Sequence, residues 1–245
     1  MHLLGIAVGL SILGSLGGVI VASSFLLLGE PVRVRLVPWL IAYAVGTLVG
    51  VALLALVPEA LADLPARTAM LTLAAGILAF FLLEKFVLWR HCHEDEACSV
   101  HNTAASLVIL GDSFHTFVDG AVIAAAVVTS LPLGLTTALA VATHEIPQEV
   151  GDVAILLRAG YSRMRAFTLN ILAGAGGILG AIAMLLASRV VPGALPYVLA
   201  FAAGNFLYVA MVDLIPDLHR GTHATVSGWR QLLLISAGIG TIALL

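Results

Sequence analysis

Long apolar stretches, each followed by a short polar one, recur about every 30 residues along this chain. A helix needs ~20 apolar residues to cross a hydrocarbon core of ~30 Å. The pattern therefore predicts an all-α, polytopic membrane protein with eight transmembrane helices. We place these helices at about 3–28, 37–57, 68–89, 102–128, 133–157, 167–187, 195–215 and 229–245.

Composition strengthens this interpretation. Apolar residues make up 61% of the chain, charged residues only 10%, and the mean hydropathy is +1.10. These values exclude a soluble surface and leave the lipid bilayer as the expected surroundings, with no nucleic-acid partner and no organic cofactor. We expect one transmembrane domain over 1–245. It consists of helices 1–3 (about 3–89), a cytoplasmic metal-rich loop (about 90–101), helices 4–5 (about 102–157) and helices 6–8 (about 167–245).

Basic residues are distributed unevenly between the hairpins. Nine Lys and Arg residues lie at the hairpins after the first, third, fifth and seventh predicted helices, and two lie at the others. Because basic residues favour the cytoplasmic side, both termini are expected to be extracytoplasmic. The compact chain with short loops and no leader suggests the plasma (inner) membrane of a prokaryote, as a multi-pass protein.

An internal repeat relates the second predicted helix to the seventh. Each has a glycine followed twelve positions later by a proline and an acid, in AVGTLVGVALLALVPEAL and AAGNFLYVAMVDLIPDL, and the offset between them is 158 residues. The charge distribution gives these two helices opposite directions, which is typical of an inverted repeat. Helices 1–3 then mirror helices 6–8, and helices 4 and 5 form the central pair of a 3+2+3 bundle.

The central pair carries polar groups that are costly at membrane depth. Helix 102–128 has Asp112, His115 and Asp119 along one face, and helix 133–157 has His144 and Gln148 on one stripe with three acids on the next. A charged side chain there costs ~3 kcal/mol on insertion scales, so these groups must face each other, water or an ion. The three acids of the second stripe are Glu145, Glu149 and Asp152.

A cation is needed to neutralise this set. Neither helix contains Lys or Arg before Arg158, so ion pairs within the pair cannot do so. Imidazole, carboxylate and amide oxygen suit zinc, iron(II), manganese or similar ions, and we expect His115, Asp119, His144 and Gln148 to hold one. Asp112, Glu149 and Asp152 are ligands, path-lining groups or acceptors that orient the imidazoles, the latter two being favoured.

Two further features have open interpretations. Pro147 cannot donate to Thr143, so it either loosens one turn beside the predicted ligands or only kinks the helix for packing. The loop HCHEDEACSVH is either a site of cytoplasmic metal capture or a solvated acidic hairpin. The loop residues of the predicted capture site are His91, Cys92, His93 and His101.

The central motifs resemble those of the ZIP family of divalent-metal (zinc/iron) transporters. GDSFHTFVDGAVIAAA is similar to that family's HNFxDGxAIGAA, and HEIPQEVGD is similar to the HExPHExGD motif of one subfamily. The resemblance implies an eight-helix 3+2+3 bundle, often a homodimer. It also implies movement of zinc and related ions toward the cytoplasm through sites between helices 4 and 5.

The resemblance also assigns residues. His115, Asp119 and His144 match primary-site ligands, and Glu145 matches an acid that can serve an adjacent second metal. Two positions depart from the motifs. Thr116 stands where the family has Asn, which weakens the case for a complete second site. Gln148 stands where the subfamily has His, which gives a neutral oxygen donor and a broader or weaker metal preference.

We therefore expect transport of a divalent cation, zinc or else iron, manganese or cadmium, by alternating access, with the mirrored triples rocking against the central pair. The protein is not expected to be an enzyme. One alternative is an intramembrane zinc metallohydrolase, since H-E-x-x-Q is similar to the zinc-binding H-E-x-x-H pattern. Gln148 in place of the second His and the interrupting Pro147 argue against it. Another alternative is a metal-sensing or scaffold membrane protein, which net ion flux would distinguish.

Overall fold

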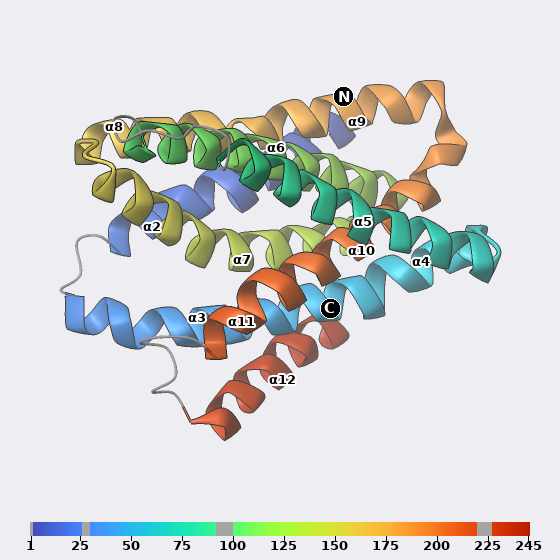
Figure 1. Ribbon diagram of the computed structural model, residues 1–245. Coiled ribbons are helices and arrows are strands. Elements are labelled where there is room, and N and C mark those ends of the chain that lie inside the picture. The colour runs from blue at the N-terminus through green and yellow to red at the C-terminus, as the bar shows by residue number, and fades with distance from the viewer. Residues whose placement is uncertain (1, 26–29, 92–99, 220–226) are drawn as a thin grey trace.

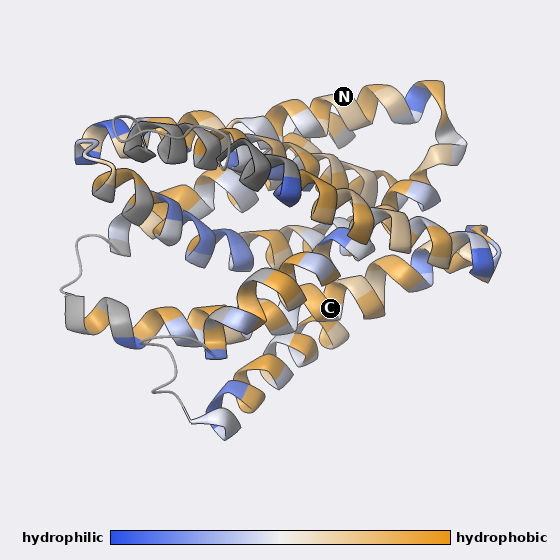
Figure 2. Ribbon diagram, in the orientation of Figure 1, coloured by the Kyte–Doolittle hydropathy of each residue, from blue (hydrophilic) through white to orange (hydrophobic). Residues whose placement is uncertain are grey.

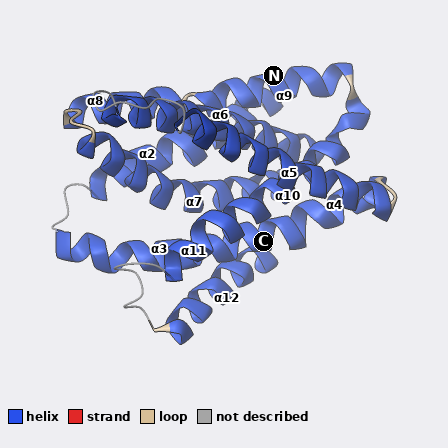
Figure 3. Ribbon diagram, in the orientation of Figure 1, coloured by secondary structure: helices blue, strands red, loops and turns tan. Residues whose placement is uncertain are grey.

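The computed structural model describes residues 2–25, 30–91, 100–219 and 227–245. Within these ranges the chain is helical with short connections and has no strand, and helices follow all eight predicted spans (Figures 1 and 3). The first half contains α1 (His2–Ser11), η1 (Ile12–Leu16), α2 (Gly17–Phe25), α3 (Glu30–Gly50), η2 (Val51–Leu56), α4 (Val57–Asp63), α5 (Ala66–His91) and α6 (Val100–Thr129). The second half contains α7 (Leu131–Arg158), α8 (Arg163–Gly174), α9 (Gly176–Val190), η3 (Pro192–Ala194), α10 (Leu195–Tyr208), η4 (Val209–Leu214), α11 (Ile215–His219) and α12 (Gly228–Leu244).

Length and hydropathy agree with a membrane protein. Among the described residues, six segments are long and apolar enough to cross a membrane, and Gly228–Leu244 is a shorter apolar helix. The fifth span, α7, has enough length but carries the polar run from Thr143 to Asp152, which lowers its hydropathy. Figure 2 shows mostly hydrophobic ribbons interrupted by hydrophilic turns along α7. The prediction of an all-α polytopic membrane protein is confirmed.

The inverted repeat is visible in two equivalent helix contacts, each of which depends on a glycine. A Cβ atom on Gly46 of α3 would lie 2.1 Å from the carbonyl oxygen of Ile235 in α12. A Cβ atom on Gly204 of α10 would lie 2.0 Å from the carbonyl oxygen of Leu73 in α5. Gly204 is 158 residues after Gly46, and small residues permit such close backbone approach between helices in lipid. The second and eighth spans therefore pack as the seventh and third do.

The two repeats also share a helix defect. Val51–Leu56 and Val209–Leu214 are both π-helical, and they again differ by 158 residues. Each is followed two positions later by the predicted proline, Pro58 or Pro216, which has no N–H for the helical ladder. The repeat that the Gly and Pro positions indicated in the sequence is thus also present in the backbone conformation. The π-helical turns themselves were not predicted. Pro147 has no such effect, because α7 stays α-helical through it.

Close packing divides the helices into two groups. The central group consists of α1, η1, α2, α6, α7, α8 and α9, in which α6 packs along α9 and α2 packs on α7. The flanking group consists of α3, η2, α4, α5, α10, η4, α11 and α12, in which α12 packs along α3 and α10 along α5. Figure 1 shows α6, α8 and α9 together in the upper part of the view and α3 and α12 together below.

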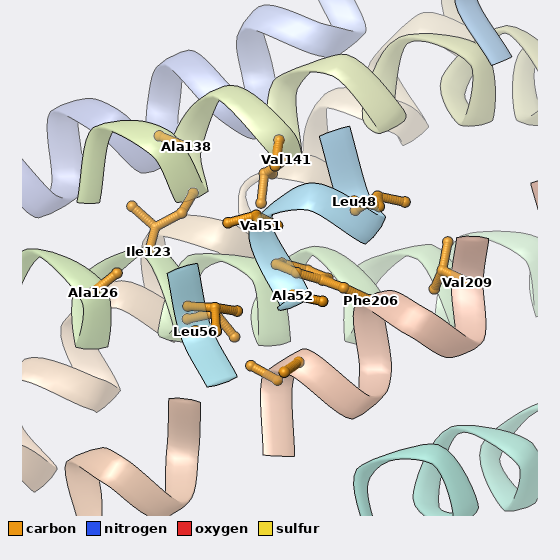
Figure 4. Packing of buried hydrophobic residues seen from close by; sticks show 14 of the residues in the cluster. Leu48, Val51, Ala52, Leu56, Ile123, Ala126, Ala138, Val141, Phe206 and Val209 are labelled. Atoms are coloured by element: carbon orange, nitrogen blue, oxygen red, sulfur yellow. The ribbon is translucent and has the colours of Figure 1, made fainter. Parts of the chain in front are cut away.

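Apolar side chains fill the contact between the two groups. Figure 4 shows Leu48, Val51 and Leu56 of the second span in the same cluster as Ile123 of α6 and Phe206 of α10. All five are fully buried or nearly so. One polar contact joins the groups, a 2.6 Å hydrogen bond between the hydroxyls of Thr47 in α3 and Thr143 in α7.

Candidate metal centre

Four side chains of α6 and α7 converge in the interior of the central group. His115, Asp119, His144 and Glu145 are buried, and each offers a ligand atom within 4.8 Å of the others. We call this set the first cluster. His115 and Asp119 are one helical turn apart on α6, so both project from the same face, while His144 and Glu145 are neighbours on α7. The antiparallel helix pair therefore brings two ligands from each side.

The distances in the first cluster suit a small cation. The two Nε2 atoms lie 3.1 Å apart, and Asp119 Oδ2 is 3.1 Å from His144 Nε2 and 3.6 Å from His115 Nε2. Glu145 Oε1 is 3.8 Å from both Nε2 atoms. Ligands at ~2.0–2.2 Å from a tetrahedral zinc are about 3.3–3.5 Å from each other. The cluster needs only small shifts to reach that geometry.

The orientation of His144 leaves the lone pair of its Nε2 atom available to bind a metal ion. Its Nδ1 lies 3.0 Å from the carbonyl oxygen of Ala140, which can only accept a hydrogen bond. Nδ1 therefore carries the proton in the neutral ring, and the Nε2 lone pair faces the cluster. A backbone partner that fixes the tautomer of a histidine in this way is characteristic of metal-binding histidines.

Rings from the flanking group pack against both imidazoles. The Phe80 ring of α5 makes an edge contact with the His115 ring, with centroids 6.0 Å apart, and the Phe206 ring of α10 lies 5.9 Å from the His144 ring. These aromatic neighbours exclude water and limit ring rotation. Sequence reasoning did not find them, because they lie on other spans and no local signal links them to the motifs.

A second cluster lies beside the first. Asp112, Glu145 and Glu149 offer oxygen atoms within 4.8 Å of one another, and all three residues are buried. Asp112 precedes His115 by one turn, and Glu149 follows Glu145 by one turn. The second cluster is thus displaced toward the end of the bundle where α6 begins and α7 ends, which is the end with the basic hairpins. Glu145 belongs to both clusters.

No Lys or Arg among the described residues pairs with the carboxylates of the two clusters. The ion contacts of this set are those of Asp119 and Glu145 with the two imidazoles. Buried charges in proteins are normally paired or coordinate a metal. A divalent cation is the group whose charge and ligand preference fit this donor set.

Three other residues named in the sequence analysis, Gln148, Asp152 and Thr116, lie beside the clusters or outside them. Gln148 is half-buried one turn beyond His144, and Glu145 approaches both imidazoles. Asp152 is half-buried and belongs to neither cluster. The Thr116 hydroxyl lies 2.8 Å from the carbonyl oxygen of Ala173 in α8 and 3.0 Å from that of Asp112, so its proton is used in a backbone hydrogen bond.

The predicted loop site lies largely outside the described residues. Residues 92–99, which include Cys92 and His93, are not described. His91 is the last residue of α5 and His101 is the second residue of α6, and the side chains of both are also outside the description. Metal capture by this loop stays a prediction.

A helical membrane bundle with imidazoles and carboxylates gathered between two central helices defines a metal-binding membrane protein. Comparison with known proteins gives its family. The model of the ZIP zinc transporter family matches residues 88–245. The chain is 36% identical over 223 residues to zinc transporter ZIP13 of Pongo abelii, covering 84% of this chain and 65% of the relative. It is 34% identical over 261 residues to zinc transporter ZIP13 of Homo sapiens, covering 84% and 69%.

The chain belongs to the ZIP zinc transporter family, which is a family of transporters and not of enzymes. The resemblance drawn from the two central motifs is therefore confirmed. A further relative, zinc transporter ZIP13 of Danio rerio, is 40% identical over 146 residues, covering 58% of this chain and 41% of the relative. The chain thus spans between 41% and 69% of the length of these relatives.

The expected prokaryotic localisation is wrong. The relatives are eukaryotic zinc transporters of human, orangutan, zebrafish and Schizosaccharomyces pombe, and they point to a eukaryotic membrane protein. The expectation was based on short loops. Loop length reflects how closely consecutive helices pack, and it carries no information on the organism or its membranes.

Proposed function

We propose that this chain, as a single transmembrane domain, transports zinc across a membrane through the two clusters between α6 and α7. The observation that carries the proposal is the arrangement of the clusters in series. The first cluster combines imidazoles and carboxylates, which bind zinc well, and the second consists of carboxylates alone. A zinc ion that shifts by about one helical turn exchanges nitrogen ligands for oxygen ligands, with Glu145 common to both positions.

The direction of release follows from what surrounds the clusters. Toward the basic end of the bundle lie the carboxylates of Asp112 and Glu149. In the other direction along α6 and α7, the residues after Asp119 and before His144 include the fully buried apolar side chains of Ile123 and Val141. Beyond this apolar layer a cavity of about 490 Å³ is lined by Glu59 and Asp63, among other residues. We propose that zinc arrives at this acidic cavity and leaves at the basic end, which the positive-inside bias assigns to the cytoplasm.

Alternating access requires two bodies that move against each other. Rocking of the mirrored triples against the central pair was expected, but the tightest contacts join α3 to α12, α5 to α10 and α6 to α9. These contacts tie each triple to the other triple or to the central pair. We therefore propose that the central group moves as one body against the flanking group. Among the described residues, apolar side chains such as Leu48, Val51 and Ile123 fill much of the contact between them, and a sliding motion does not break contacts between such side chains as costly as buried ion pairs.

We propose His115, Asp119, His144 and Glu145 as the zinc ligands at the start of this path, with Gln148 one turn away as a further donor when the helices move. Asp112 and Glu149 act at release, and Asp152 lines the path beyond them. Thr116 fastens α6 to α8 and does not bind the ion. Transport of iron, manganese or cadmium and assembly as a homodimer stay predictions.

Uptake into proteoliposomes tests the proposal. Protein reconstituted around a trapped zinc-sensitive dye should give zinc-dependent fluorescence, and His144→Ala and Asp119→Ala should each reduce the uptake rate by more than about 100-fold, because each removes a direct ligand. Protein in the same vesicles is quantified to exclude loss of folding. Thr168→Ala, which changes an exposed hydroxyl of α8, is the control and should transport normally. Uptake that persists in both ligand variants would refute the site.

The hydrolase alternative is not supported by this geometry. In the H-E-x-x-H pattern two histidines of one helix bind zinc and the glutamate activates water. Here the second histidine comes from α6, and Glu145 lies at ligand distance from both rings.

A further inference from the structure

An apolar cavity of about 680 Å³ lies on the outside of the bundle where α5, α6 and α10 meet. Its walls include Phe80 and Leu82 of α5, Phe114 of α6 and Phe201 of α10, and Lys85 is the charged residue among its described lining residues. It is separate from both metal clusters, and the transport path does not use it.

The cavity opens toward the surrounding lipid. Leu82 and Phe114 on its walls are 63% and 48% exposed, and they belong to helix segments that are long and apolar enough to span the membrane. Acyl chains surround such side chains in the hydrocarbon region. A concave apolar surface at this depth is filled by a hydrocarbon chain, because water there would lack hydrogen-bond partners.

Lys85 supplies a positive charge at one end of the cavity. It lies near the end of α5 that carries the basic hairpin, and its side chain is exposed, so its long stem can extend the ammonium group toward the lipid headgroups. The ammonium also lies 5.8 Å from the centroid of the Phe81 ring, which holds it near the wall of the cavity. A positive charge at this depth favours an anionic headgroup.

A second copy of the chain is a poorer occupant. A two-fold interface centred on this cavity places the same patch of both copies face to face. Lys85 of one copy would then approach Lys85 of the other in a region of low dielectric constant, where like charges repel strongly. The described lining residues include no carboxylate that could compensate, because apart from Lys85 they are apolar.

We propose that this groove is a binding site for an anionic phospholipid, with one acyl chain against Phe80, Phe114 and Phe201 and the phosphate at Lys85. The site touches the transport machinery through one residue. Phe80 lines the groove, and the same ring packs edge-on against His115 of the first cluster. An acyl chain in the groove therefore restrains the ring that packs against His115, and zinc affinity should respond to the lipid. This second effect depends on the proposed function, whereas lipid binding does not.

Native mass spectrometry of zinc-free protein released from nanodiscs tests the lipid site. Discs of phosphatidylcholine with an equal amount of phosphatidylglycerol should yield protein that retains phosphatidylglycerol preferentially. Lys85→Gln should reduce this preference about fivefold, since one Lys near the membrane surface contributes ~1 kcal/mol toward anionic lipid. Arg67→Gln, at the opposite end of α5, is the charge-matched control and should retain the preference.

A second pair of variants tests the acyl-chain part of the groove. Ala79→Phe narrows the groove from within and should reduce retention of both lipids, whereas Ala75→Phe adds the same ring to an exposed position of α5 outside the groove. Equal phosphatidylglycerol preference in the parent and Lys85→Gln overturns the proposal, as does cross-linking that shows a second copy covering Ala79. Loss of lipid preference with unchanged zinc uptake supports the lipid site and rejects only its coupling to His115.

Discussion

The central and flanking groups differ in what they bury. The central group buries Asp112, His115, Asp119, His144, Glu145 and Glu149, whereas the flanking group buries no Asp, Glu or His among its described side chains. Glycines allow close helix packing in both groups: they let α3 approach α12 and α10 approach α5 in the flanking group, and α6 approach α9 in the central group. Helices in lipid associate through packing and hydrogen bonds, because acyl chains are as apolar as leucine. One group therefore uses its interior for a stable frame, and the other keeps costly groups for a cation.

The largest effect is expected when the close helix contacts of the flanking group are disrupted. Gly46→Ala places a Cβ atom 2.1 Å from the backbone oxygen of Ile235, so α3 and α12 must separate. Overpacking of this kind costs about 1–3 kcal/mol or more, and the melting temperature in detergent should fall sharply. Gly204→Ala, its counterpart in the other repeat, should do the same. Gly240→Ala on α12 meets nothing within 4 Å and should melt at or above the parent temperature, so equal melting of all three variants would contradict the mirrored packing.

The next test addresses the central group, where we expect loss of binding without loss of the fold. Asp119→Asn keeps the size of a buried side chain that packs in the first cluster but removes its charge. Zinc affinity, measured by isothermal titration in detergent, should fall by about 100-fold or more, because losing a ligand exceeds the ~10-fold to 100-fold cost of losing a group that supports one. The melting temperature of the zinc-free protein should rise or stay the same, since an uncompensated buried charge has been removed. A fall in both quantities together would mean that the aspartate is structural.

Glu149→Gln separates binding from release. Glu149 belongs only to the second cluster, so zinc affinity should change by less than about tenfold, whereas the uptake rate should fall by about tenfold or more because the oxygen site on the way out is weakened. Asp152→Asn, one turn further along α7 and in neither cluster, should have a smaller effect. Equal effects of Glu149→Gln on affinity and on rate would place this residue at the primary site.

The smallest expected effect concerns Thr116. Thr116→Val removes the hydroxyl that donates to Ala173 but keeps the shape, and it should cost about 0.6–1 kcal/mol of stability with zinc affinity unchanged. Thr168→Val, an exposed threonine on α8 whose hydroxyl bonds only its own helix, is the matched control. A clear drop in zinc affinity for Thr116→Val would make this residue part of the metal site.

Particular residues show which features of the fold and of the site could be predicted from the sequence. Hydropathy located eight helices, because the thickness of the hydrocarbon layer sets the length of an apolar run. The spacing of His115 and Asp119, and the presence of His144 on the neighbouring helix, predicted three members of the first cluster, because the helical period fixes which side chains share a face. Glu145, which the family resemblance assigned to an adjacent second metal, lies 3.8 Å from both imidazoles, and the role of Gln148 as a ligand stays a prediction.

By itself, the sequence determined the membrane environment, the helix count, the repeat and the types of side chain available to a cation, because each depends on local composition or on helical periodicity. The tertiary structure alone decided that the tightest contacts run across the repeats, that Phe80 and Phe206 enclose the two histidines, and that the carboxylates form two clusters sharing Glu145. These features depend on the crossing and rotation of helices far apart in the chain, which follow from the packing of all spans at once.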